Sequence, residues 1–117
     1  VDSINSVDVF GLGQMIRFND RFKLEGINVN FVQQQDDKIF VRTYERGVED
    51  ETYACGTGAV ASAMSVALKE GKDGDFNIPI RVLGGQLYVS FHKEDTSFSK
   101  VFLTGPAVQV FQGSISI

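Results

Sequence analysis

Residue types that support several common kinds of site are scarce in this sequence. Its 117 residues include one cysteine, one histidine, two prolines and no tryptophan. One cysteine excludes an internal disulfide, and with a single histidine it also excludes a structural zinc site of four such ligands. The formal net charge of −4 argues against nucleic acid as a partner, because a phosphate backbone needs a basic surface. No apolar run approaches a membrane span, and we expect no membrane partner.

The remaining composition is that of an ordinary globular protein. Hydrophobic residues make up 43% of the chain and charged residues 22%. A chain of this length can bury one modest core, so we expect residues 1–117 to form a single domain. A lone thiol and the lack of a signal-peptide pattern favour a cytoplasmic location. The first residue is Val1, which is compatible with a processed product or a cloned fragment.

The apolar patterns predict mostly strands with two helices. A short helix is expected over residues 7–18, although Gly11 and Gly13 weaken it. Three strand pairs are expected: 27–34 with 39–44 around a turn at 35–38, 78–83 with 87–91 across Gly84-Gly85, and 100–104 with 107–111 around Gly105-Pro106. A last short strand is expected at 114–117.

The strongest pattern is a helix over residues 56–70. It is apolar around nearly its whole circumference, which is typical of a buried helix, and Lys69 and Gly71 provide a normal carboxyl end. We therefore expect an α+β domain in which mixed or antiparallel strands wrap around this central buried helix.

The residues with chemical potential gather where that helix begins. The segment reads Ala54-Cys55-Gly56-Thr57-Gly58. The first N–H groups of a helix have no internal partner and can hold an anion, while the same helix end stabilises a thiolate. The two glycines remove side chains that would block a ligand. The alternative is that Cys55 is a small buried hydrophobic residue, as lone cysteines often are.

Three other motif interpretations lack supporting context. The pattern G-x-G-x-x-A at residues 56–61 matches a loose dinucleotide fingerprint, but no clear βαβ unit follows. Cys55 and His92 could form a Cys–His hydrolase pair, but no orienting partner is evident. Asp73 and Asp75 could belong to a calcium loop, but the other ligands are absent, and a solvated turn is expected.

Two upstream segments could bind a substrate, but neither indicates a function by itself. Glu45-Arg46-Gly47 ends a predicted strand, where Arg46 could pair with a substrate carboxylate and Glu45 with an ammonium group. The alternative is a surface ion pair of little energetic worth. Asn28 could bind a ligand or serve a turn.

Together these segments resemble the second half of diaminopimelate epimerases. That family carries Gly-Val-Asn, then Glu-Arg-Gly, then Ala-Cys-Gly-Thr-Gly opening a buried helix. Here Gly-Ile-Asn at 26–28, Glu-Arg-Gly at 45–47 and Ala-Cys-Gly-Thr-Gly at 54–58 follow in the same order and at similar spacing, and the tail from Gly105 to Gly113 also looks like the family's end. Proline racemases share the Cys-Gly-Thr-Gly segment, so Asn28 and Glu-Arg-Gly are what point to diaminopimelate.

The resemblance implies a PLP-independent epimerase that needs no cofactor and no metal and interconverts LL- and meso-diaminopimelate in lysine and cell-wall precursor biosynthesis. One thiolate removes the α-proton and a second thiol reprotonates the opposite face. Cys55 would be one of these thiols, and Glu45 is also expected among the catalytic residues. Gly56 and Thr57 would bind the α-carboxylate, and Asn28, Glu45 and Arg46 would contact other parts of the substrate.

The resemblance also implies that a second, similar half supplies the other thiol, so the expected partner is an amino-terminal half of the same protein. Two copies of this chain could instead pair as a homodimer. One stretch departs from the family pattern, since residues 48–50 are one residue longer and lack a second glycine. Another cofactor-independent racemase of the same fold, or an anion-binding domain with an inert Cys55, remain the alternatives.

Overall fold

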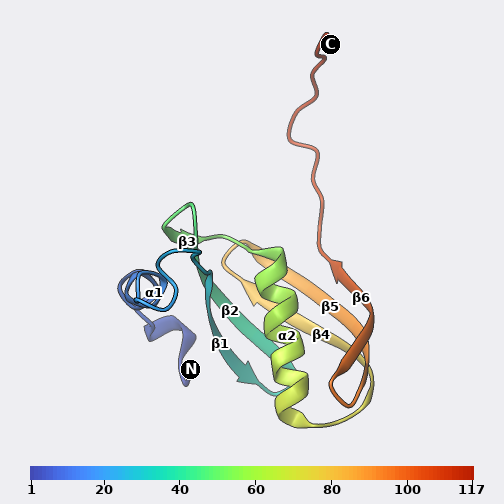
Figure 1. Ribbon diagram of the computed structural model, residues 1–117. Coiled ribbons are helices and arrows are strands. Elements are labelled where there is room, and N and C mark those ends of the chain that lie inside the picture. Colours follow the sequence, from blue (N-terminus) through green and yellow to red (C-terminus); the bar gives the residue numbers. More distant parts are fainter.

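The computed structural model describes all 117 residues, and its six strands form one mixed sheet that curls around a helix (Figure 1). The elements follow in the order η1 (Ile4–Ser6), α1 (Val9–Arg17), β1 (Val29–Gln35), β2 (Lys38–Glu45), β3 (Asp50–Thr52), α2 (Gly56–Glu70), β4 (Gly74–Val82), β5 (Gly85–Glu94) and β6 (Ser97–Thr104). The strand order is β1-β2-β4-β5-β6, with the short β3 paired to the end of β2. Only β2 and β4 pair in parallel. The predicted fold class is confirmed.

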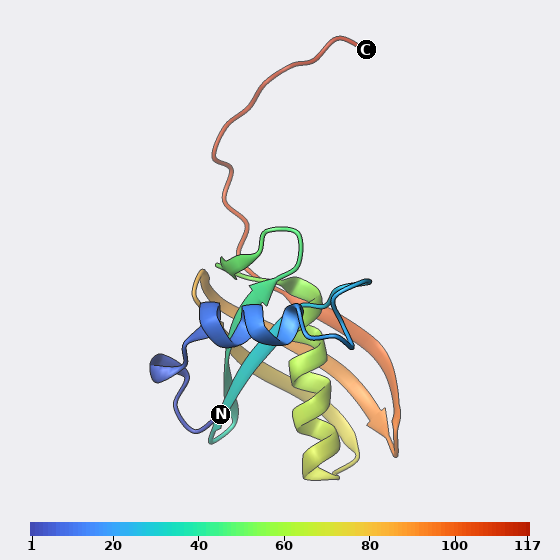
Figure 2. The ribbon, with the colours of Figure 1, turned by 60° about the vertical axis from the view of Figure 1, so that its left-hand side comes forward.

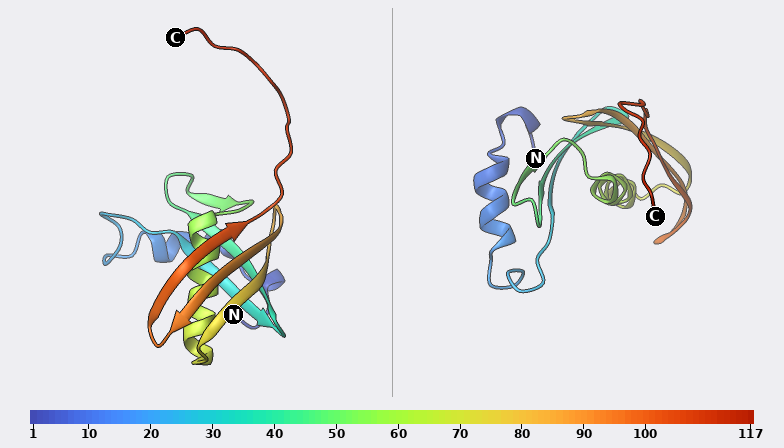
Figure 3. Two further views of the ribbon diagram at one scale, coloured as in Figure 1. Left: turned by 90° about the vertical axis from the view of Figure 1, so that its right-hand side faces the viewer. Right: turned by 90° about the horizontal axis from the view of Figure 1, so that it is seen from above.

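The β1–β2 hairpin has a helix on each of its faces. Ile39 and Val41 belong to the core beneath α2, whereas Val29, Phe31 and Tyr44 pack in a second core with the segment that contains α1. Successive strand residues point to opposite faces, so a hairpin covered on both sides places apolar residues on each of its faces. Figure 3 shows this arrangement from above, with α2 inside the curve of the sheet and α1 outside it.

Helix α2 is buried along one stripe of small side chains. Ala59, Ala63 and Ala67 are fully buried at spacings of four residues, which lets the helix lie close to the concave face of the sheet. Its opposite side, including Thr57, Ala61, Ser65 and Leu68, is exposed. The sequence pattern predicted burial nearly all round, but within this chain the sheet covers one side only (Figure 3). Neither helix is long and apolar enough to cross a membrane.

The glycines that weakened the prediction of α1 lie where packing requires them. The Asp8 carboxylate caps this helix and accepts the Gly11 N–H at 2.9 Å. A Cβ at Gly13 would lie 2.4 Å from the Cβ of Tyr44, so only glycine lets α1 approach β2 this closely. The helix at residues 7–18 is therefore confirmed within two residues at either end.

The predictions for the last third of the chain are partly wrong. β6 pairs with β5 around Asp95, which has a left-handed φ of 55°, and does not pair with residues 107–111. Residues 105–117, including the expected strand at 114–117, have no regular structure and extend away from the body of the molecule (Figure 1). The alternating apolar residues of this tail therefore find no neighbouring strand in this chain, so their pattern alone was misleading.

The remaining differences concern turns and one short strand. Val82 pairs with Gly85, which makes Leu83-Gly84 the turn of the β4–β5 hairpin, one residue earlier than predicted. β3 was not predicted, because three residues are too few to show a pattern. The divergent stretch 48–50 leads into β3, and Glu49 takes a left-handed φ of 57° there.

Candidate active site

Cys55 occupies the N-cap position of α2, with extended backbone angles of φ −128° and ψ 110°. Its carbonyl oxygen accepts the Ala59 N–H at 2.9 Å, and its side chain makes no capping hydrogen bond. The N–H groups of the first helical turn therefore lack an intrahelical partner, at the end where the helix dipole is positive. The thiol thus lies beside backbone donors without an intrahelical partner, at the upper end of α2 in Figure 1.

Two polar side chains contact the sulfur. The amide Nδ2 of Asn28 donates to Cys55 Sγ at 3.6 Å, and the hydroxyl of Thr57 lies 3.5 Å from the same atom. The other end of the Asn28 amide accepts the backbone N–H of Arg46 at 2.8 Å. The structure therefore brings together three of the predicted residues, Asn28, Cys55 and Thr57, and connects them to Arg46. Donors on sulfur stabilise negative charge there.

Glu45 and Arg46 do not form the ion pair that was considered as an alternative. Glu45 Oε2 accepts the hydroxyl of Thr52 at 2.9 Å, while the Arg46 guanidinium donates to the backbone carbonyl of Glu25. The two side chains thus diverge from a common turn. Glu45 is half-buried and Arg46 is exposed, and only the Arg46 backbone connects directly to Asn28.

The glycines around Cys55 also serve packing, a role that the sequence did not predict. A Cβ at Gly58 would lie 2.4 Å from Oδ1 of Asn30, an atom that accepts the Thr43 hydroxyl at 2.7 Å. A Cβ at Gly56 would lie 3.0 Å from the Leu103 side chain. Both glycines therefore allow the start of α2 to lie close to the sheet.

The competing motifs have other partners in the structure. His92 lies on β5 opposite Asp75, and its two ring nitrogens contact Asp75 at 2.7 Å and Glu94 at 3.2 Å. Asp75, and then Glu94, raise the pKa of His92. Because β4 begins where α2 ends, this histidine is separated from Cys55 by the length of a helix of about 22 Å, which does not suit a Cys–His pair.

Asp73 lies in the exposed connection between α2 and β4, as expected, whereas Asp75 is an exposed residue of β4. The Asp73 carboxylate accepts the buried ammonium of Lys93 at 2.8 Å and the N–H of Asp95 at 3.0 Å. The Lys93 ammonium, and then the Asp95 N–H, lower the pKa of Asp73.

No three side chains of histidine, cysteine, aspartate or glutamate converge in a way that could hold a metal ion. Helix α2 lies in the connection between the parallel neighbours β2 and β4, but β3 and a loop separate β2 from Gly56, whereas in a dinucleotide-binding unit the glycine-rich turn leads directly from the strand into the helix.

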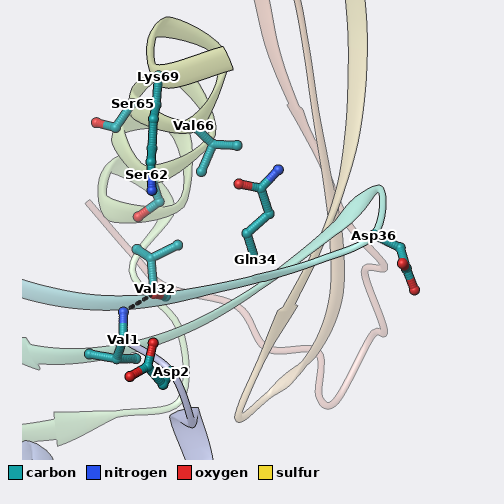
Figure 4. A pocket seen from close by; sticks show the side chains of 9 residues that line it. All are labelled: Val1, Asp2, Val32, Gln34, Asp36, Ser62, Ser65, Val66 and Lys69. Carbon is teal, nitrogen blue, oxygen red and sulfur yellow. Dashed lines mark hydrogen bonds between the residues drawn. The ribbon is translucent and has the colours of Figure 1, made fainter.

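The largest hollow of the molecule is not at Cys55. A depression of about 610 Å³ lies between β1 and the middle of α2, lined among others by Gln34, Ser62 and Lys69 (Figure 4). At the start of α2 there is instead an apolar depression of about 450 Å³, lined by Gly56, Thr57, Val60, Ala61, Met64 and Leu103. Within this chain, the Cys55 end of the helix is therefore an open surface.

Sequence reasoning missed the residues that support this end of the helix. Thr52 holds the Glu45 carboxylate, and the carbonyl of Tyr53 accepts the Gly84 N–H at 2.8 Å, so the β4–β5 turn supports the approach to Cys55. The Tyr53 side chain itself is 78% exposed. A threonine before a predicted helix and a tyrosine in a loop carry no distinctive pattern. The Gly84-Gly85 pair was noticed only as a turn.

Comparison with known proteins identifies the family. The sequence model described as diaminopimelate epimerase matches residues 1–110. The chain is 47% identical over 115 residues to the diaminopimelate epimerase of Flavobacterium psychrophilum, covering 97% of the chain and 44% of that protein. It is 44% identical to the enzyme of Aquifex aeolicus, covering 99% and 41%, and 43% identical to that of Methanocella arvoryzae, covering 100% and 39%. It thus spans about two fifths of the length of these relatives. The chain belongs to the diaminopimelate epimerase family.

Proposed function

We propose that this chain is the carboxy-terminal half of an epimerase that interconverts LL- and meso-diaminopimelate without a cofactor, and that Cys55 is one of its two acid–base thiols. The observation that carries the proposal is the position of Cys55 at the open amino end of α2, with Asn28 and Thr57 on its sulfur. The proteins named diaminopimelate epimerase that match this chain support the choice of substrate.

The helix end supplies the binding energy where charge develops. The substrate α-carboxylate accepts the backbone N–H groups of Gly56 and Thr57, which are unpaired within α2. As the α-proton leaves, negative charge spreads from the α-carbon into this carboxylate, and fixed donors stabilise it more in the transition state than in the ground state. The Thr57 hydroxyl and the Asn28 amide hold the sulfur beside the bound carboxylate.

The reaction needs one proton acceptor and one proton donor. The Cys55 thiolate takes the α-proton from one face and becomes a thiol. The thiol of the other half gives its proton to the opposite face and becomes a thiolate. One C–H bond breaks and one forms at the same carbon, so the configuration inverts without oxidation or reduction. In the reverse direction the two sulfurs exchange roles.

The other half of the protein would complete the site. It would supply the second thiol and cover the exposed outer side of α2, where this chain is open. Glu45 and Arg46, at the turn whose Arg46 backbone N–H binds Asn28, would contact the substrate head group or its far end. The isolated chain offers one acid–base group, so we expect it to be inactive, because losing one such group typically costs about 10²–10⁴ in rate.

Exchange with solvent deuterium tests this proposal. Full-length protein is incubated with LL-diaminopimelate in deuterated water, and both α-deuterium uptake and change of configuration are followed. We expect inversion with uptake for the full-length protein, and neither for residues 1–117 alone. Exchange without inversion in the isolated chain would still identify Cys55 as a base. Efficient inversion by the isolated chain, lost in Cys55→Ser and increasing with dimer concentration, would show that two copies of this half suffice.

A binding domain with an inert cysteine predicts a different result. In that case the full-length protein would show neither exchange nor inversion, and alkylation of Cys55 by iodoacetamide would proceed at the same rate with and without diaminopimelate. Protection of Cys55 by diaminopimelate, together with exchange, would separate the enzyme from the binder.

A further inference from the structure

The turn that follows β2 is closed by its own backbone and takes an unusual shape. The Glu49 N–H donates to the Glu45 carbonyl at 2.7 Å, and both Gly47 and Glu49 have left-handed backbone angles, with φ of 91° and 57°. Glycine adopts such angles freely, but a residue with a side chain resists them unless other contacts hold it. The contacts of the Glu49 side chain are therefore informative.

The Glu49 carboxylate is bound on both oxygens. Oε1 lies 3.2 Å from both Nε and Nη2 of Arg17 and accepts the backbone N–H of Gly47 at 3.1 Å. Oε2 accepts the hydroxyl of Tyr44 at 3.1 Å. The Gly47 N–H, then the Tyr44 hydroxyl and the Arg17 guanidinium, lower the pKa of Glu49. The Glu49 side chain thus binds the backbone of its own turn and, in addition, one residue of α1 and one of β2.

Both outside partners of Glu49 are firmly placed. Arg17 is the last residue of α1, and only 12% of its side chain is exposed. Tyr44 on β2 is fully buried, packed against Gly13 of the same helix. The turn is therefore fastened to the core between α1 and the β1–β2 hairpin, on the opposite face of that hairpin from α2.

The far side of the turn reaches the candidate site. The Arg46 N–H donates to Asn28, whose amide donates to the Cys55 sulfur. Gly26 has a φ of 76°, and a Cβ there would lie 2.3 Å from the Arg46 side chain and 2.9 Å from the Arg17 guanidinium. The two arginine side chains thus pass over one glycine, and a shift of the turn would move Arg46 and release Asn28.

We infer that Glu49, held by Arg17 and Tyr44, is a positioning residue that fixes the turn at 45–49 so that Arg46 and Asn28 stay in place beside Cys55. This inference rests on the proposed function, since Arg46 and Asn28 are the groups proposed to meet the substrate. It assigns a role to the stretch in which this sequence departs from the family pattern. Glu49 itself contacts neither the sulfur nor the proposed carboxylate site.

The test uses full-length protein with Glu49→Gln, Glu49→Gly and Tyr44→Phe. We expect kcat/KM for diaminopimelate to fall about 10- to 100-fold in the two Glu49 variants, mainly through KM, because small misplacements of substrate-contacting groups cost up to about 10². Tyr44→Phe keeps the ring in the core and removes one hydrogen bond, so its effect should be smaller. Glu70→Gln is the matched control, because Glu70 also accepts a side-chain bond, from Gln34 at 2.6 Å, but at the far end of α2.

Amide hydrogen exchange at Arg46 and Gly47 gives a reading that does not depend on activity. We expect both amides to exchange at least about tenfold faster in Glu49→Gln and Glu49→Gly than in the wild type, and at the wild-type rate in Glu70→Gln. If Glu49 mattered only through its backbone angle, Glu49→Gly would leave both the amide exchange rates and KM unchanged, because glycine adopts that angle freely. Unchanged exchange and unchanged KM in Glu49→Gly would overturn the inference, and if the Glu49 variants do not fold, unchanged exchange in Tyr44→Phe would do so. A wild-type protein without activity on diaminopimelate would overturn the proposed function, while the exchange rates would still decide the role of Glu49.

Discussion

At its carboxyl end, α2 stops on Gly71 in a left-handed conformation, and several charged side chains beyond it pair with one another. Lys93 reaches Asp73 and the carbonyl of Lys72, and His92 lies between Asp75 and Glu94. At its amino end, the Cys55 side chain makes no capping bond and leaves the first helical N–H groups without a protein partner. The two ends therefore differ in their side chains: those beyond the carboxyl end are engaged with one another, whereas the amino end has a thiol beside helical N–H groups that could bind a ligand.

The largest expected effect that would test this contrast is on catalysis. Cys55→Ser should lower kcat of the full-length enzyme by at least about 10²–10⁴, because a hydroxyl is a far weaker base than a thiolate. His92→Gln, at the other end of α2, should leave kcat unchanged. Steady-state kinetics with LL-diaminopimelate measures both. Equal decreases in kcat in the two variants would show that the two ends of α2 do not differ in their importance for catalysis.

The next effect concerns the fit of the helix start against the sheet. In Gly58→Ala the new Cβ would lie 2.4 Å from Asn30 Oδ1, well inside contact distance. Overpacking of this kind costs about 1–3 kcal/mol, which outweighs the gain of up to about 1 kcal/mol that alanine brings to a helix. We expect a lower free energy of unfolding in urea and a lower kcat/KM. A more stable variant would show that the helix start can move outward without loss.

At the other end, Gly71→Ala should affect stability alone. A Cβ at Gly71 would meet no atom within 4 Å, so the cost comes only from the φ of 71°. A left-handed alanine costs about 1 kcal/mol. We expect that decrease in the free energy of unfolding with unchanged kcat/KM. Any change in the kinetic constants would indicate that the carboxyl end is coupled to the site.

The smallest effect is on the pH dependence of stability. Asp75 and Glu94 raise the pKa of His92 above its ordinary value of 6.5. The folded state therefore binds the proton more tightly than the unfolded state, so the stabilisation is complete below pH 6.5 and is lost as the pH rises through the folded-state pKa. Urea midpoints on the two sides of this window should differ in the wild type. His92→Gln should remove this difference, and a difference that persists would assign it to another group.

Local patterns predicted a large part of this fold from the sequence. The small apolar residues of α2, its stop at Gly71 and two antiparallel hairpins depend on neighbours within a few positions, and each was confirmed. The third pair at 100–104 and 107–111 was wrong, because alternation marks a strand without identifying its partner, and β6 has its partner in β5.

The residues of the candidate site could be named from the sequence, but the contacts between them could not. Cys55 and the helix start are adjacent in sequence, and Asn28 was noticed through the resemblance. The contact between Asn28 and Cys55 spans 27 positions, and that between Arg17 and Glu49 spans 32. The second contact follows from the path of α1 across the β1–β2 hairpin (Figure 2), and the first from the return of the chain through β3 to the start of α2; no local pattern specifies either path.

The most direct test of the central claim is a crystal structure of the full-length protein grown with diaminopimelate. The proposal predicts density for the substrate α-carboxylate at the N–H groups of Gly56 and Thr57, with the α-carbon beside Cys55 Sγ. Clear density for the ligand elsewhere, such as the depression lined by Gln34, Ser62 and Lys69, with none at the start of α2, would contradict it.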